Sequence, residues 1–541
     1  MNAPPKAAPA QQWMSVAQAL ALVEQQRQAG ELAAAADLCQ QLLRAQPNHP
    51  EVLHVLGIIA HQRGDAAAAI DLIKKAIGAN GTVPLFYSNL GEICRLAGRV
   101  EEAVAAGRRA LELQPNSPHA LNNLGIAYYD QEKYEAAEEC YRRAIALEPN
   151  FAEAHSNLGN ALRTQHKADE AISAYNRAIQ LKPKYVDAIA NYASVLHLSG
   201  RIDDAIATYK RALALDPIQA NAHSGLGLLM LTKGDYENGW FGYEWRLRCT
   251  ETRYRPPPGP VWEGDDLGGR RILILTEQGF GDALQFSRYL PMVRDRGGAV
   301  VFPAPAPLRS LIAHSMPWIE VPIAGQPPPT YDCQCPLLSL PQRMQTRIET
   351  IPSAVPYLRA SPEALARWRA RLGEGPQFKV GLVWAGNPKQ LNDINRSMPG
   401  EALMPLLAVD GVRFFSLQVG YRAGELTRIS NGKVVDLAPD LTDFMETAGA
   451  IGNLDLVVTV CTSVAHLAGG LGKPMWVALS WNPDWRWGAD PQACAWYPTA
   501  RLFRQRTRRE WGWVAESLAA ELRAVVAGDR SRLAPFAIRA A

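Results

Sequence analysis

A 34-residue repeat runs through about the first 240 residues and constrains the fold of this chain more than any other feature. One grid places a Leu, followed by Gly, at every 34th position, and a second grid places a Pro. The Leu grid is Leu56, Leu90, Leu124, Leu158 and Leu226, with Tyr192 in the remaining slot, and the Pro grid is Pro47, Pro115, Pro149, Pro183 and Pro217, with Gly81 in the vacant slot. Because so short a unit cannot bury its own apolar face, the units are expected to stack into an array.

Each unit also carries small residues where two packed helices would touch, such as Gly125, Ala137 and Ala144. The Pro that closes the unit ends its second helix, since Pro has no backbone N–H to donate. This combination resembles the tetratricopeptide repeat, a helix-turn-helix module of the same length. The resemblance covers about residues 16–240 and implies an all-α superhelix whose concave face holds a peptide or a partner protein.

A row of asparagines precedes the Leu position in four successive units. The row consists of Asn89, Asn123, Asn157 and Asn191. A side-chain amide both donates and accepts hydrogen bonds, so such a row fits the backbone of an extended acceptor peptide whatever its side chains. It resembles the asparagine row that lines the superhelix of the O-linked N-acetylglucosamine transferases. The alternative is that Asn is tolerated at this helix position and is simply solvated.

At 541 residues the chain is too long for one hydrophobic core, so further domains are expected after the array. Residues 1–15, rich in Ala and Pro, are predicted to be a disordered tail. The stretch 241–269 is predicted to be an aromatic cap and a Pro-rich linker, with the domain boundary near residue 255.

Short apolar runs typical of buried parallel strands follow the linker. They lie at 271–276, 378–384, 412–418, 456–460 and 474–479. We therefore expect a short N-terminal Rossmann-like lobe at 270–375 and a C-terminal lobe with a final helix at 376–541. Two such lobes with a cleft between them constitute the glycosyltransferase B architecture.

Three motifs in this half resemble the heptosyltransferase family, glycosyltransferase family 9. They are the pair Gly281 and Asp282, the segment 396–399, and the segment 462–474. Together with the repeats, this half is similar to bacterial tetratricopeptide proteins identified as family-9-like glycosyltransferases. The resemblance implies transfer of a sugar from a nucleotide sugar, and it makes the C-terminal lobe the nucleotide-sugar-binding lobe.

The same resemblance assigns roles to individual residues. Asp282 matches the general base that takes the proton of the acceptor hydroxyl, and the alternative is an Asp that caps the following helix. Arg396 matches the cation that binds the leaving diphosphate, and the alternative is a surface Arg. Thr462 and Ser463, at a turn before a helix, are expected to offer backbone N–H groups to that diphosphate.

Three further residues complete the expected donor site. His466 is expected either to hydrogen-bond the donor or to pack as a structural His under the turn, Gln418 to touch ribose or base, and Gly281 to border the donor. No cofactor beyond the donor and no metal are expected, because transferases of this architecture generally act without a divalent ion. The aromatic loop 481–487 is expected either to stack on a nucleotide or sugar or to pack the lobes.

Four substitutions depart from the family pattern around the cleft. Cys461 stands in place of an Asp, Val419 of a Lys, Gln390 of a His and Ile394 of an Arg. They favour an alternative function, an interaction scaffold whose glycosyltransferase half has lost catalysis. A third hypothesis keeps the activity but makes the acceptor a glycan or lipopolysaccharide.

Composition limits the partners and the compartment. A net charge of +3 excludes a nucleic-acid footprint based on bulk charge. The chain shows no apolar run long enough for a membrane span and no signal peptide at its start, and its 8 Cys residues are scattered. These features predict a cytoplasmic protein that binds no nucleic acid. The repeats and the resemblance to glycosyltransferases imply its partners, a protein acceptor and a nucleotide sugar.

Overall fold

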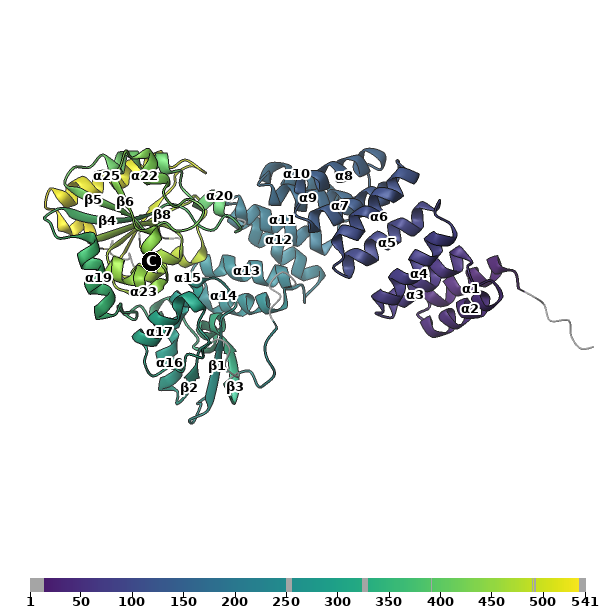
Figure 1. Cartoon of the computed structure of the whole chain (residues 1–541), viewed down its shortest axis with the longest axis horizontal. Coiled ribbons are helices and arrows are strands. Elements are labelled where there is room, and N and C mark those ends of the chain that lie inside the picture. Colours follow the sequence, from purple (N-terminus) through teal and green to yellow (C-terminus); the bar gives the residue numbers. More distant parts are fainter. Residues whose placement is uncertain are drawn as a thin grey trace, which may run out of the picture. The chain divides into compact units, whose positions relative to one another are not determined.

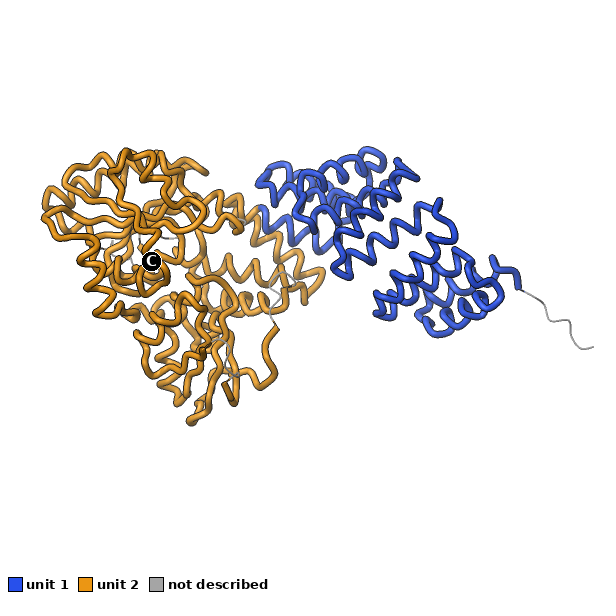
Figure 2. Tube along the Cα trace, viewed as in Figure 1, with its two compact units in different colours: residues 1–195 blue, residues 196–541 orange. Residues whose placement is uncertain are grey.

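The computed structural model describes residues 14–249, 255–323, 329–390, 392–488, 490 and 493–534 (Figure 1). Nearly all of the expected tail, 1–15, and residues 250–254 of the expected cap and linker lie outside the described residues. The chain divides into two compact units, residues 1–195 and residues 196–541 (Figure 2). This division precedes the predicted boundary near residue 255, because the last repeat helices pack with the sheets that follow them.

Antiparallel helix pairs make up the repeat region, as the period predicts. The helices are α1 (Val16–Gln28), α2 (Leu32–Ala45), α3 (Pro50–Gln62), α4 (Ala66–Ala79), α5 (Pro84–Leu96), α6 (Val100–Leu113), α7 (Pro118–Asp130), α8 (Tyr134–Leu147), α9 (Ala152–Thr164), α10 (Ala168–Leu181), α11 (Val186–Leu198), α12 (Ile202–Leu215), α13 (Ala220–Thr232) and α14 (Tyr236–Tyr243). The grid glycines permit close packing within a pair: a Cβ at Gly125 would lie 2.5 Å from the Tyr141 ring. Large residues on one helix therefore fill the space that Gly leaves on the other.

Gly227 offers a direct test of this packing, because an added Cβ would lie 2.5 Å from the backbone N of Tyr243 and 2.6 Å from the backbone C of Gly242. Backbone atoms cannot rotate away, so Gly227→Ala is expected to lower the free energy of unfolding by about 1–3 kcal/mol. Tryptophan fluorescence during urea unfolding measures the change. Gly512→Ala, whose Cβ would meet nothing within 4 Å, is the control and should stay within about 0.5 kcal/mol of the parent.

A small parallel sheet with strand order β2-β1-β3 follows the repeats. Its strands are β1 (Arg271–Leu275), β2 (Ala299–Val301) and β3 (Cys333–Pro336), and its helices are α15 (Phe280–Phe286), α16 (Leu290–Asp295), α17 (Arg309–Ser315) and α18 (Leu340–Arg343). α14 is anchored to this lobe through Trp240, whose Nε1 donates to the carbonyl of Thr346 at 2.9 Å. The aromatic end of the array is thus part of the hydrophobic core of the second unit.

A second sheet of six parallel strands has the order β6-β5-β4-β7-β8-β9. Its strands are β4 (Phe378–Val383), β5 (Val412–Ser416), β6 (Val434–Asp436), β7 (Leu456–Val460), β8 (Met475–Leu479) and β9 (Ala500–Arg504). The helices are α19 (Pro362–Leu372), α20 (Asp393–Arg396), α21 (Met404–Leu407), α22 (Glu425–Ile429), α23 (Phe444–Gly452), α24 (Ser463–Gly470) and α25 (Gly512–Val526). Counted along the chain the order is 3-2-1-4-5-6, that of a doubly wound α/β sheet. Ligands of such sheets bind at the carboxyl ends of the strands where the order reverses, here between β4 and β7.

Candidate functional site

The turn from β7 into α24 lies at this reversal point. Thr462 precedes the helix with extended backbone, and Ser463 is its first residue. The first N–H groups of a helix have no partner within the helix and carry the positive end of its dipole. The turn can therefore present N–H groups to an anion, as predicted for Thr462 and Ser463.

Arg396 reaches the same turn from the segment that follows β4. Its guanidinium donates through Nε to Asp393 Oδ1 at 2.9 Å and through Nη1 to the carbonyl of Cys461 at 3.3 Å. Gly386 leaves room for it, since a Cβ there would lie 2.3 Å from Nη2 of Arg396. The structure thus brings Arg396 together with Thr462 and Ser463.

Asp282 is occupied by two partners. Its Oδ2 accepts from the backbone N–H of Gly279 at 3.0 Å, which caps α15, and its Oδ1 accepts from Arg486 at 2.5 Å. Burial raises the pKa of Asp282, and the positive charge of Arg486 acts in the opposite direction. The helix-capping interpretation of this Asp is therefore realised in the structure, and the carboxylate is held by an ion pair in addition.

Arg486 is the central residue that sequence reasoning missed. It pairs with Asp282 and also with Asp484, to which Nη1 donates at 2.9 and 3.1 Å, and only 8% of its side chain is exposed. The guanidinium also stacks over Trp485 at 4.5 Å. The available sequence signal was the presence of two charged residues, Asp484 and Arg486, inside the aromatic loop 481–487. A charge buried among aromatic side chains requires a partner of opposite charge.

His466 packs against α15 through Gly281. A Cβ at Gly281 would lie 2.8 Å from Cδ2 of His466, so Gly at this position permits α15 and α24 to approach closely. The imidazole Nδ1 shares a 2.8 Å hydrogen bond with Tyr497 Oη, and the ring stacks on Trp487 at 5.7 Å. Burial lowers the pKa of His466 to about 3. These contacts match the alternative of a structural His packed under the turn.

Gln418 forms hydrogen bonds with backbone groups of the second sheet. Its Oε1 accepts from the N–H groups of Trp384 and Ala385 at 3.2 and 3.0 Å, and its Nε2 donates to the carbonyl of Val419 at 3.2 Å. The amide therefore supports the chain where β4 ends, instead of pointing free groups toward a nucleotide.

The four asparagines of the repeat region are half-buried, and each donates its Nδ2 to the preceding repeat. The contacts are Asn89 with His54 Nε2 at 2.9 Å, Asn123 with Ser88 Oγ at 3.5 Å, Asn157 with Asn122 Oδ1 at 2.9 Å, and Asn191 with Asn160 Oδ1 at 3.1 Å. The row thus joins successive repeats through its donors. Each carbonyl oxygen Oδ1 of the row has no protein partner within residues 14–195 and can accept from a bound peptide.

A cavity of about 150 Å³ lies beside Arg396 within the second unit. Residues at the end of α11, on α13 and in the segments after β4, β7 and β8 line it. Its lining is His197, Leu198, Leu228, Thr232, Gln390, Asn392, Arg396, Cys461, Leu479, Ser480, Asn482, Pro483, Asp484 and Trp485. Two of the departures from the family pattern, Gln390 and Cys461, thus line a cavity, whereas Ile394 and Val419 are 44% and 51% exposed.

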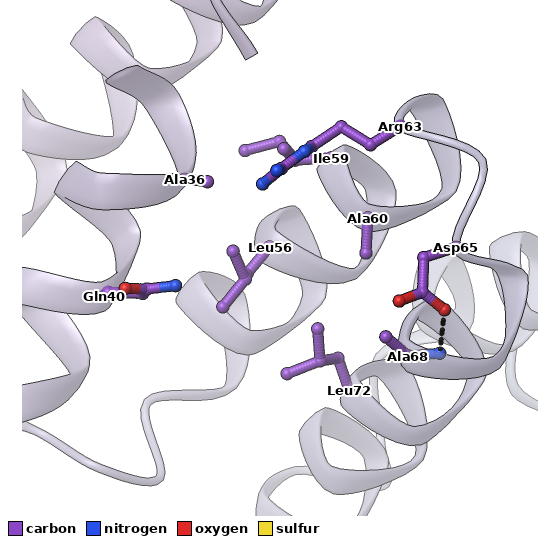
Figure 3. A pocket seen from close by; sticks show the side chains of 9 residues that line it. All are labelled: Ala36, Gln40, Leu56, Ile59, Ala60, Arg63, Asp65, Ala68 and Leu72. Atoms are coloured by element: carbon purple, nitrogen blue, oxygen red, sulfur yellow. Dashed lines mark hydrogen bonds between the residues drawn. The ribbon is translucent and has the colours of Figure 1, made fainter. Parts of the chain in front are cut away.

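A separate cavity of about 320 Å³ lies between α2, α3 and α4 in the first unit (Figure 3). Its lining includes the apolar side chains of Leu56, Ile59 and Leu72 and the charged side chains of Arg63 and Asp65. Asp65 is already engaged, because Oδ1 accepts from the backbone N–H of Ala68 at 2.9 Å and caps α4.

Comparison with known proteins identifies the repeats. Sequence models of the tetratricopeptide repeat match residues 20–84, 122–186 and 83–150, and a TPR repeat model matches residues 193–234. The first 234 residues therefore contain tetratricopeptide repeats, as predicted.

The chain is also similar to a curated protein, Protein FlbA of Caulobacter vibrioides, with 27% identity over 327 residues. The match covers 54% of this chain and 54% of FlbA, so the chain spans about half the length of this relative. Among solved structures, MamA is 26% identical over 32% of this chain and 97% of its own, with a TM-score of 0.29. A tetratricopeptide repeat protein from Parabacteroides merdae is 17% identical over 44% of this chain and 94% of its own, with a TM-score of 0.39.

Across the described residues we find no helix with the length and apolar character that crossing a bilayer requires.

Proposed function

We propose that this protein is a glycosyltransferase that moves a sugar from a nucleotide-sugar donor to a hydroxyl of a protein bound by its repeats. The observation that carries the proposal is the cavity at the strand-order reversal of the second sheet, which α13 of the last matched repeat also borders. A peptide-binding module and a site suited to a phosphorylated ligand thus share one cavity wall.

The proposed donor site consists of Arg396 and the turn at Thr462 and Ser463. As the sugar leaves, negative charge grows on the phosphate oxygen, and a fixed guanidinium with helix N–H groups stabilises that charge. The cavity is smaller than the range of about 300–1,000 Å³ typical of complete ligand sites. It therefore fits the phosphate and sugar end of the donor, with the nucleoside outside it.

The proposed acceptor site is the concave face of the repeats. Repeat arrays bind extended peptides along this face, and the Oδ1 atoms of the asparagine row supply acceptors for a peptide backbone. We therefore propose a protein acceptor in preference to a glycan or lipopolysaccharide, which would have no evident use for the array.

A donor-binding experiment tests the proposal. Full-length protein is titrated calorimetrically with UDP-, GDP-, ADP-, CMP- and dTDP-sugars, and we expect one nucleotide class to bind. Arg396→Ala should weaken that binding roughly tenfold to a hundredfold, because it removes a charge-assisted hydrogen bond to phosphate. Arg428→Ala, which removes an exposed Arg on α22, is the matched control and should bind as the parent does. Absence of binding by every donor at millimolar concentration would contradict the proposal.

An interaction scaffold without catalysis is the second candidate, and the Asp282 ion pair is the observation that favours it. A carboxylate held by Arg486 and by the Gly279 N–H is a poor base until those partners release it. This candidate predicts peptide binding by the repeats with no turnover of any donor.

A further inference from the structure

The cavity beside Arg396 holds few groups able to take up a proton. Its titratable lining residues are His197, Arg396, Cys461 and Asp484. Arg396 carries a guanidinium, which donates hydrogen bonds and has no acceptor atom. Burial raises the pKa of the Cys461 thiol to about 11, so this group also stays protonated at neutral pH.

Two carboxylates near the cavity are already engaged. Asp484 accepts two hydrogen bonds from Nη1 of Arg486 and one, at 3.0 Å, from the Arg486 backbone N–H. Burial acts to raise the pKa of Asp484, and the positive charge of Arg486 outweighs it, so the pKa is lowered. Asp282 pairs with the same guanidinium and is not among the residues that line the cavity. Neither carboxylate is a free base in this arrangement.

His197 differs from all of these groups. Its imidazole has no hydrogen-bond partner within the part of the second unit that the structure describes. Its position is nevertheless fixed, because Asn482 Nδ2 donates to the backbone carbonyl of His197 at 2.5 Å. That contact joins the end of α11 to the loop after β8 and holds His197 in the wall of the cavity that Arg396 and Cys461 also line.

We propose that His197, at the end of a repeat helix, is the general base that accepts the proton of the acceptor hydroxyl. This inference rests on the proposed transferase function. In the step, the acceptor oxygen forms a bond to the anomeric carbon while the bond from that carbon to the phosphate oxygen breaks. The electron pair of the broken bond leaves with the phosphate, next to Arg396, and the hydroxyl proton passes to the free ring nitrogen of His197 and then to solvent.

The protonation state of His197 suits this role. Burial lowers the pKa of His197 to about 4, and the negative charge of Asp484 acts in the opposite direction. Arg396 and the protonated Cys461 thiol are the other titratable groups on the cavity wall. His197 is therefore neutral at pH 7 and able to accept a proton, and it loses this ability as the pH falls through about 4.

The location gives the repeats a direct part in the chemistry. His197 and Leu198 end α11, and residues 193–234 match a TPR repeat. A protein acceptor held by the repeats would then meet its base on the array itself. The Rossmann-like half would supply only the donor.

Donor hydrolysis tests the inference, with water as the acceptor and UDP-, GDP-, ADP-, CMP- and dTDP-sugars as probes. Full-length parent, His197→Gln and His314→Gln are compared by nucleotide release from pH 4 to pH 8 and by calorimetric donor affinity. We expect His197→Gln to bind donor within threefold of the parent and to release nucleotide roughly 100-fold more slowly. The parent rate should level off above pH 5, whereas the residual rate of His197→Gln should keep rising with pH. His314→Gln replaces an exposed His of α17 and should match the parent.

Any other outcome contradicts either the base role of His197 or the proposed transferase function. Nucleotide release by His197→Gln within threefold of the parent excludes His197 as the base and leaves the transferase proposal standing. Parallel loss of donor affinity and rate makes His197 a binding residue and also excludes the base role. A parent that binds or hydrolyses no donor overturns the proposed function itself. If His197→Gln is unfolded at the assay temperature, rescue of His197→Ala by added imidazole replaces it, and failure of rescue counts against the base.

Discussion

Replacing Arg486 by Met is expected to destabilise the second unit by about 3–5 kcal/mol. The change leaves Asp282 and Asp484 buried without their shared counter-ion, and breaking a buried ion pair on one side costs about this much. Met is close to the Arg stem in length, but it also removes the cation–π contact of the guanidinium with Trp485, so the loss reports on the positive charge as a whole. Every Trp of the chain except Trp13 lies in residues 196–541, so tryptophan fluorescence during urea unfolding follows this unit.

Two controls separate the buried network from charge loss in general. Arg371→Ala removes a surface pair with Asp440 in the same unit, and it should change stability by less than about 0.5 kcal/mol. Adding Asp282→Asn and Asp484→Asn to Arg486→Met should recover part of the loss, because neutral amides cost less to bury than carboxylates. A loss below about 1 kcal/mol for Arg486→Met would mean that water already solvates the two carboxylates.

The repeat array was predictable because its information is local and periodic. Every unit places Leu, Gly and Pro at fixed offsets, and a contact such as Gly125 with Tyr141 recurs as Gly159 with Tyr175 one period later. The asparagine contacts recur with the same period. Asn89, Asn123 and Asn157 each reach a partner 35 residues earlier, so a search one residue beyond the 34-residue period could have found these partners.

The parallel strands were predictable for a similar reason, since a buried parallel strand is a short apolar run flanked by turns. Their spatial order was not predictable, because no local pattern fixes which strand lies beside which. The division of the chain after residue 195 also escaped prediction. It depends on aromatic residues of α14, such as Trp240, meeting Trp485 and Trp496 far along the chain.

The residues of the candidate site also divide into those that the local sequence predicts and those whose state depends on distant packing. Arg396 and the turn at Thr462 were predicted and do lie together, because both follow strands that are neighbours in the sheet. The state of Asp282 could not be read from the sequence, since its partner Arg486 lies 204 residues away. Gln418 was assigned to the donor because it follows a strand end, yet the backbone of a neighbouring strand uses its amide. A polar residue at a strand end has both uses, and only the packing decides between them.

Stability of the second unit is expected to fall as the pH is lowered from 6.5 toward 3, and His466 should cause a large part of the fall. Burial lowers the pKa of His466 to about 3, whereas an unfolded His titrates near 6.5. Between pH 6.5 and about pH 3 the unfolded chain therefore binds a proton at this His, whereas the folded chain does not. The stabilising effect of the neutral His is complete only above about pH 6.5. One such group costs up to roughly 1.4 kcal/mol for each pH unit, or about 2 kcal/mol between pH 6.5 and pH 5.

Urea unfolding followed by tryptophan fluorescence at pH 7.5, 6.5, 5.8 and 5.0 measures this slope, and His466→Gln supplies the comparison. Gln does not titrate, so the variant should start less stable at pH 7.5, through loss of the Tyr497 contact, and then lose less stability on acidification. The two stability curves should approach one another as the pH falls. His197, whose pKa burial lowers to about 4, adds an effect of the same sign and of nearly the same size down to about pH 5, and this effect remains in the variant. Parallel curves for parent and His466→Gln would show that His466 is already protonated or solvated in the folded protein, contrary to its packing between Trp487 and Gly281.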